Sequence, residues 1–105
     1  MSNLLKEMCS LAGKLSNFVD YLQDKDENEK LLELNLKVNE LIEKMPYQEF
    51  DENDDFYLDT IEKIIDTGGV IKAFKENRIK LVDVFDHLNT IIKNVIKIMD
   101  IENGK

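Results

Sequence analysis

The sequence predicts an all-α protein, a small antiparallel bundle of about four helices. Apolar residues recur at alternating steps of three and four positions along most of the chain, which is the spacing of a helix with one buried face. No stretch shows the alternation of apolar and polar residues that a half-buried strand requires. The chain has 105 residues, of which 43% are hydrophobic. This length suits one core and not two, so residues 1–105 are expected to form a single helical domain.

The N-terminal half contains two predicted helices. Ser2 is the expected N-cap of the first helix, which runs to about Gln23. The second helix follows the polar run at residues 24–28 and ends at Pro46, because proline disfavours helical geometry at the residue before it. The expected buried positions are Leu4, Met8, Leu11, Leu15, Phe18 and Leu22 in the first helix, and Leu31, Leu34, Val38, Leu41 and Met45 in the second.

The C-terminal half contains a third helix that begins near Asp54 and a last segment that is the longest. Glycine is favoured just past the end of a helix, so the third helix is expected to stop at residues 67–69. The last segment then covers residues 70–100. Its expected buried positions are Ile71, Phe74, Leu81, Phe85, Leu88, Ile92, Val95 and Met99. Arg78 interrupts this apolar register, so the segment either kinks or breaks there, or continues and pairs its end with another chain.

The formal net charge of −8 is concentrated in one short segment. Residues 49–62 contain seven acidic residues and no basic residue, whereas residues 1–48 and 63–105 are each much closer to balance. Dispersed acidity favours only solubility. Concentrated acidity creates a local field that selects a partner of opposite charge.

Half of the aromatic residues lie within or beside this acidic segment. Tyr57 is expected in the core, while Tyr47 and Phe50 are expected to be free to contact a partner. Aromatic side chains among charged ones are typical of binding hot spots. The predicted partner-binding residues are Tyr47, Glu49, Phe50, Asp51, Glu52, Asp54, Asp55 and Asp59. The alternative is that Asp51, Asp54 and Asp55 only cap the third helix and stabilise its positive end.

This pattern predicts a non-enzymatic protein that occupies a basic surface of a protein partner, as an immunity protein, an antitoxin or a phage-type inhibitor does. The alternative from another class is a homo-oligomeric structural or regulatory protein, for example a homodimer. The basic residues near the start of the last segment are Lys72, Lys75, Arg78 and Lys80. They are too few to predict direct nucleic-acid binding, but they can pair with the acidic segment of another copy.

A further alternative is metal binding by the segment Asp51–Glu62. Its oxygen-bearing side chains have a spacing that resembles an EF-hand calcium loop. They are Asp51, Asn53, Asp55, Tyr57, Asp59 and Glu62. The sixth position of such a loop needs glycine for its sharp turn, and Phe56 stands there. We therefore expect no bound calcium and no cofactor.

No pattern in the chain predicts catalysis. The pairs Glu40–Glu43 and Asp59–Glu62 resemble the Glu-x-x-Glu motif of all-α nucleotide pyrophosphatases, but the helical periodicity turns both pairs outward. His87 is the only histidine and lies beside the apolar register, where we expect a half-exposed surface residue. The expectation is therefore that the chain is not an enzyme.

The remaining features concern the compartment. Cys9 is the only cysteine, so no disulfide forms within the chain, which fits a reducing cytosol. The first residues lack the basic and apolar regions of a signal peptide, and no apolar run approaches the length of a membrane span. We expect a cytoplasmic protein without membrane contact. Lysine outnumbers arginine thirteen to one, a bias typical of a low-GC bacterium or its phage.

Overall fold

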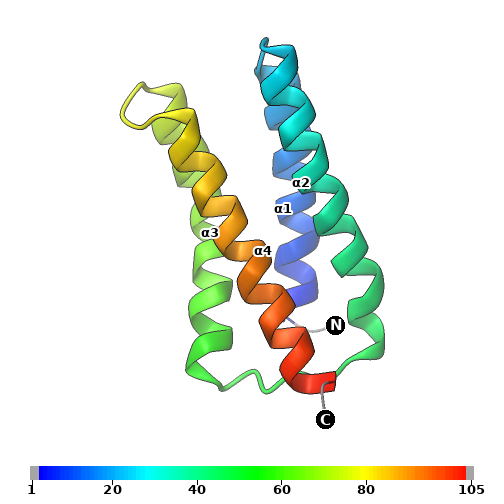
Figure 1. Cartoon of the computed structure of the whole chain (residues 1–105). Helices are drawn as coiled ribbons and strands as arrows, with labels where there is room; N and C mark the ends of the chain where they lie inside the picture. The colour runs from blue at the N-terminus through cyan, green and yellow to red at the C-terminus, as the bar shows by residue number, and fades with distance from the viewer. Residues whose placement is uncertain (1–2, 104–105) are drawn as a thin grey trace.

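The computed structural model describes residues 3–103 and consists of four helices (Figure 1). The elements are α1 (Asn3–Tyr21), α2 (Lys25–Lys44), the short 3-10 helix η1 (Met45–Tyr47), α3 (Asp55–Lys75) and α4 (Leu81–Asn103). No strand occurs between residues 3 and 103. The prediction of an all-α helical bundle is confirmed. The expected N-cap Ser2 lies outside the described residues.

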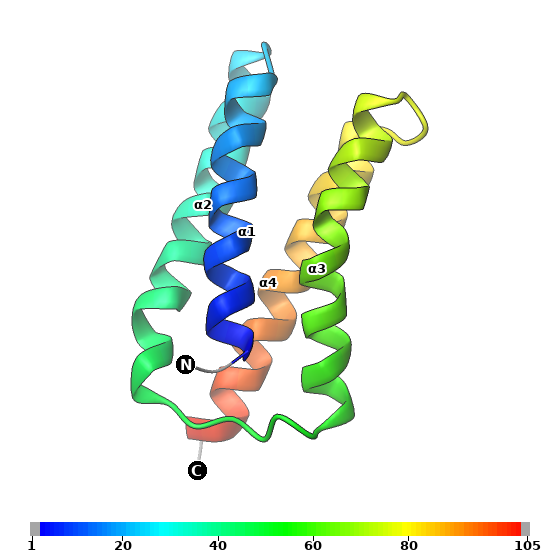
Figure 2. The same ribbon diagram turned by 180° about the vertical axis from the view of Figure 1, so that it is seen from behind.

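The helices form two antiparallel hairpins, α1 with α2 and α3 with α4, in a body of 42 × 22 × 20 Å. The hairpins meet through α1 against α3 and α2 against α4. Their turns diverge at one end of the molecule, which we call the open end (Figures 1 and 2). The connection between α2 and α3 crosses the opposite end, which we call the acidic end because it carries residues 49–59.

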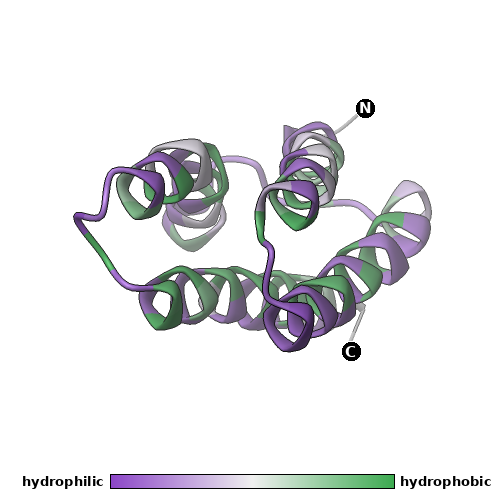
Figure 3. Cartoon of the chain, turned by 90° about the horizontal axis from the view of Figure 1, so that it is seen from above, coloured by the Kyte–Doolittle hydropathy of each residue, from purple (hydrophilic) through white to green (hydrophobic). Residues whose placement is uncertain are grey.

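The core lies between the hairpins, and hydrophobic residues lie mostly on the helix faces turned toward the other helices (Figure 3). In α1 the buried positions are those that the periodicity predicts, from Leu4 to Phe18. In α2 the polar residue Asn35 is buried where Leu34 was expected, and Leu34 is half-buried beside it. The Asn35 amide nitrogen donates a hydrogen bond to Ser16 Oγ at 3.2 Å, which joins the two helices of the first hairpin.

The prediction that the third helix stops at residues 67–69 is wrong, because α3 continues to Lys75. Glycine ends a helix only where the backbone adopts a positive φ, and neither Gly68 nor Gly69 does. Each glycine lowers helix stability by about 1 kcal/mol relative to alanine. The buried positions of α3 continue past them in register and hold the helix together. They are Tyr57, Thr60, Ile64, Thr67 and Ile71.

The break in the last segment lies where Arg78 predicts it, and its cause is Asn77. Asn77 has a φ of 63°, the left-handed conformation that asparagine tolerates better than most residues. The backbone N–H of Arg78 donates to the carbonyl of Ala73 and that of Asn77 to the carbonyl of Phe74, both at 2.9 Å. This pair of bonds is a Schellman motif, which satisfies the last carbonyls of α3 and ends the helix.

The buried face of α4 is rotated from the predicted one. Its fully buried residues include Val84 and Ile91, which the predicted register omitted, whereas Phe85 is only partly buried. The prediction was wrong because it carried one apolar register across the break at Asn77. The helix restarts with its own register after a new cap, in which the Asp83 carboxylate accepts a hydrogen bond from the Lys80 backbone N–H at 3.0 Å.

Candidate functional site

The predicted partner-binding residues are brought together at the acidic end of the bundle. Pro46 stands at the start of η1, directly after α2, and Tyr47 follows with 89% of its surface exposed. From Gln48 to Asp54 the backbone is extended or turned and runs from α2 to the start of α3 (Figure 2). Because the chain must bridge two helix ends here, its side chains are displayed along one end of the molecule.

Two of the acidic residues shape this connection. The Asp51 carboxylate accepts a hydrogen bond from the Asn53 backbone N–H at 3.1 Å, and the Asp54 N–H donates to the Asp51 carbonyl at the same distance. The Asp54 carboxylate then caps α3 by accepting from the Tyr57 N–H at 3.2 Å. Asp51 and Asp54 therefore have a local structural role, as the capping alternative predicts.

Two of the aromatic residues fasten the connection to the core. Tyr57 is 2% exposed, and its hydroxyl oxygen accepts a hydrogen bond from the Leu4 backbone N–H at 2.9 Å. The Phe50 ring packs against the Tyr57 ring with their centroids 5.9 Å apart, and Phe50 is partly buried. The expectation that Phe50 is free is therefore wrong, because its ring covers Tyr57. Tyr47 is the aromatic residue that the acidic end offers to a partner.

The remaining carboxylates of the predicted site are exposed. The side chains of Glu49, Glu52 and Asp55 make no hydrogen bond or ion pair within the described residues. Asp59 pairs with Lys63 one turn along α3 at 3.1 Å, an exposed pair of small stabilising effect. Asp55 lies in the first turn of α3, where a negative charge favours the positive helix end. The acidic end therefore combines carboxylates with a local role and carboxylates, such as Glu49 and Glu52, that only face solvent.

The segment Asp51–Glu62 does not form a calcium loop. Helix α3 begins at the fifth position of the twelve-residue window, so the later oxygen-bearing side chains lie along a helix and do not surround a common point. Nowhere in the described part of the chain do three or more His, Cys, Asp or Glu side chains gather as a metal site would require. The residues of the Glu-x-x-Glu pairs, Glu40, Glu43, Asp59 and Glu62, are all exposed, as the periodicity predicts.

His87 lies in a contact that the sequence did not reveal. Its Nε2 atom is 3.0 Å from both the Lys63 carbonyl oxygen and the Thr67 hydroxyl oxygen, so it joins α4 to α3. A carbonyl oxygen only accepts hydrogen bonds, so Nε2 carries the proton. Thr67 is fully buried and is one of the buried positions of α3 that face the other helices. Burial lowers the pKa of His87 below its ordinary value of 6.5, although the Lys63 carbonyl and the Asp66 charge oppose the shift.

This shift predicts a pH dependence of stability. Because the folded state holds the proton of His87 less tightly than the unfolded state, stability is fully present above about pH 6.5 and decreases as pH falls toward the lower folded pKa. We expect His87→Gln to flatten this part of the curve, measured by urea denaturation from pH 8 to pH 5. An equal slope in wild type and variant would assign the pH dependence to other groups.

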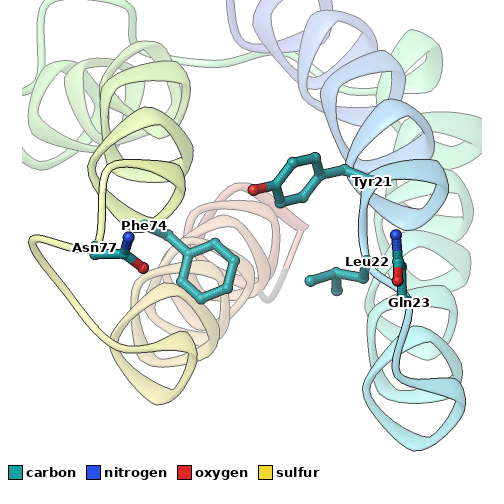
Figure 4. Close-up of a pocket in the computed structure, with 5 residues that line it drawn as sticks. All are labelled: Tyr21, Leu22, Gln23, Phe74 and Asn77. Atoms are coloured by element: carbon teal, nitrogen blue, oxygen red, sulfur yellow. The ribbon is translucent and has the colours of Figure 1, made fainter.

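A pocket of about 300 Å³ lies between the two hairpin turns at the open end (Figure 4). It is lined by Tyr21, Leu22, Gln23, Phe74 and Asn77. The ammonium group of Lys75 lies 4.5 Å from the centre of the Tyr21 ring, which places a positive charge at its rim. Periodicity could not reveal this pocket, because it forms between the ends of two helices distant in sequence. A second depression of about 310 Å³ lies between α2 and α4.

Comparison of the chain with known protein families, with characterised proteins and with solved structures found no match. None of the helices in the described residues combines the length and the apolar composition needed to cross a membrane.

Proposed function

We propose that this chain is a non-enzymatic binding protein whose acidic end occupies a basic surface on a protein partner. The observation that supports this proposal most directly is the exposure of Tyr47 at the same end of the bundle as the exposed carboxylates Glu49, Glu52 and Asp55. A desolvated aromatic centre with a charged rim is the usual composition of an interface hot spot. The small size and the acidity fit an immunity protein, an antitoxin or a phage-type inhibitor.

The concentration of charge itself supports a binding role. Seven carboxylates within fourteen residues repel one another in the isolated protein. Asp51 and Asp54 accept hydrogen bonds at the start of α3, and Asp55 lies in the first turn of α3, where its charge favours the positive end of the helix. Neither role accounts for Glu49, Glu52 and Glu62. A basic partner would relieve their repulsion and would raise the association rate, more so at low salt.

The test separates binding from folding by changing Glu49, Glu52 and Asp55, the exposed carboxylates of the predicted site whose side chains make no hydrogen bond or ion pair in the described part of the chain. The variant Glu49→Gln, Glu52→Gln, Asp55→Asn leaves the caps at Asp51 and Asp54 intact. We expect it to melt at nearly the wild-type temperature, to associate more slowly with a basic partner and to show a flatter salt dependence of the association rate. Tyr47→Ala should mainly raise the dissociation rate.

The partner is sought by affinity capture on immobilised wild-type protein, and association is then followed by stopped-flow fluorescence. The matched control, Glu29→Gln, Glu33→Gln, Glu43→Gln, makes the same charge change on exposed residues of α2. The control should bind as wild type does. If the captured proteins bind the acidic-end variant with unchanged rates and unchanged salt dependence, the acidic end is not the contact surface.

A further inference from the structure

We propose that the acidic end of one copy docks head to tail on the open end of a second copy, with Tyr47 of the first copy in the pocket of the second. This inference rests on the proposed function, because it assigns one specific partner to the same acidic end. It follows from the chemistry of the pocket, the exposure of Tyr47 and the charges around each.

The chemistry of the pocket suits a phenol ring. The rings of Tyr21 and Phe74 lie on opposite sides of it, one from the end of α1 and the other from the end of α3 (Figure 4). Aromatic rings favour offset and edge contacts with another ring. Gln23 and Asn77 also line the pocket. The side-chain amide of either residue can donate to or accept from a phenol hydroxyl.

Tyr47 is a suitable occupant by its exposure and its position. At 89% it is the most exposed large hydrophobic side chain in the described part of the chain. It stands at the opposite end of the bundle from the pocket, as the last residue of the 3-10 helix η1. A backbone already held in a helical turn loses less conformational entropy when the ring is immobilised.

The charges around the two surfaces are complementary on one side of the pocket. The turn between α3 and α4 has a net positive charge, because its exposed bases outnumber its exposed acids. The bases are Lys72, Lys75, Arg78 and Lys80, and the acids are Glu76 and Asp83. The acidic end carries exposed Glu49 and Glu52 together with Tyr47. The other turn of the open end, which joins α1 to α2, is acidic and would repel the acidic end. This asymmetry fixes the orientation of the first copy, with its carboxylates over the α3–α4 turn of the second copy.

The geometry determines the kind of assembly. The two surfaces lie at opposite ends of a 42 Å body, so the contact is heterologous and builds linear chains instead of a closed dimer. Each end face measures only 22 × 20 Å, which is less than the roughly 800 Å² per partner of a typical stable complex. We therefore expect weak association that grows with protein concentration and declines at high salt.

The test is sedimentation velocity from micromolar to millimolar protein at low and high salt. Two variants each remove one surface: Tyr47→Ala with Glu52→Gln removes the acidic one, and Lys72→Glu with Lys75→Glu removes the basic one. Each variant alone should remain monomeric. An equimolar mixture should form heterodimers, because each variant retains the surface that the other lacks. If the charge reversal unfolds the chain, the milder variant Lys72→Gln with Lys75→Gln replaces it. This variant should associate with itself more weakly than wild type does.

The matched control is Lys37→Glu with Lys93→Glu, which makes the same charge change in the middle of α2 and α4 and should associate as wild type does. A wild-type protein that stays monomeric throughout would overturn the proposal, and so would a mixture in which no heterodimer forms. The proposed function is tested separately, by the binding of Glu49→Gln, Glu52→Gln, Asp55→Asn to a basic partner. The two experiments can therefore give different results: the protein can bind a basic partner without associating with itself, or associate with itself without binding a basic partner.

Discussion

Tyr57→Ala is expected to lower the free energy of unfolding by about 3–5 kcal/mol, the range for truncation of a large aromatic side chain in a core. Tyr57 is 2% exposed and belongs to the largest fully buried side chains. Its ring supports Phe50, and its hydroxyl satisfies the Leu4 backbone N–H in the first turn of α1, which has no partner within the helix. Tyr57 therefore links α3 to α1 and to the connection between α2 and α3.

The conservative variant Tyr57→Phe separates the hydroxyl from the ring. It should destabilise by about 1–3 kcal/mol, because it leaves the buried Leu4 N–H without its acceptor. The measurement is urea denaturation followed by circular dichroism at 222 nm. Tyr47→Phe is the matched control, since the side chain of Tyr47 is 89% exposed and its hydroxyl should add little stability. If the two Phe variants were equally stable, the hydrogen bond to Leu4 would contribute nothing measurable.

Phe18→Ala is expected to destabilise by about 3–5 kcal/mol for a different reason. Phe18 is 1% exposed and lies in the last turn of α1, toward the open end. Its ring contacts the ring of Phe74 edge to face at 5.6 Å and stacks near Tyr21 at 6.2 Å. Removing it takes away the aromatic contact between α1 and α3, so both the core and the open-end pocket lose support.

The comparison for Phe18→Ala is Phe85→Ala, measured by the same denaturation experiment. Both remove the same atoms, but Phe85 is only partly buried in α4, so its truncation should destabilise clearly less. An equal loss in the two variants would show that the register of α4 differs from the one described, with Phe85 in the core. A small loss for Phe18→Ala would show that the two hairpins are held together elsewhere.

Local pattern was sufficient to predict much of this fold. The three-and-four spacing identifies the helices and, in α1, every buried position, because one helical stripe must face the core. The restricted backbone before Pro46 places the end of α2, and Asp54 places the start of α3, because caps act on their own neighbours in sequence. The position of the acidic residues and the exposure of Tyr47 also follow from the sequence.

Other features depend on contacts between residues far apart in the chain. Gly68 and Gly69 remain helical because the packing of the buried residues of α3 against the other helices outweighs the poor helix propensity of glycine. Phe50 turns onto Tyr57 because a buried ring is available across the connection. His87 meets Lys63 and Thr67 only because α3 and α4 form a hairpin.

The sequence by itself determined that the chain is helical, where most of its helices begin and end, and where its negative charge lies, because these depend on periodicity, capping and composition. Only the tertiary structure decided which hairpins meet, which face of α4 is buried and that the pocket between Tyr21 and Phe74 exists. Those features depend on how the two hairpins pack and diverge, and packing between distant segments leaves no periodic signal in the sequence.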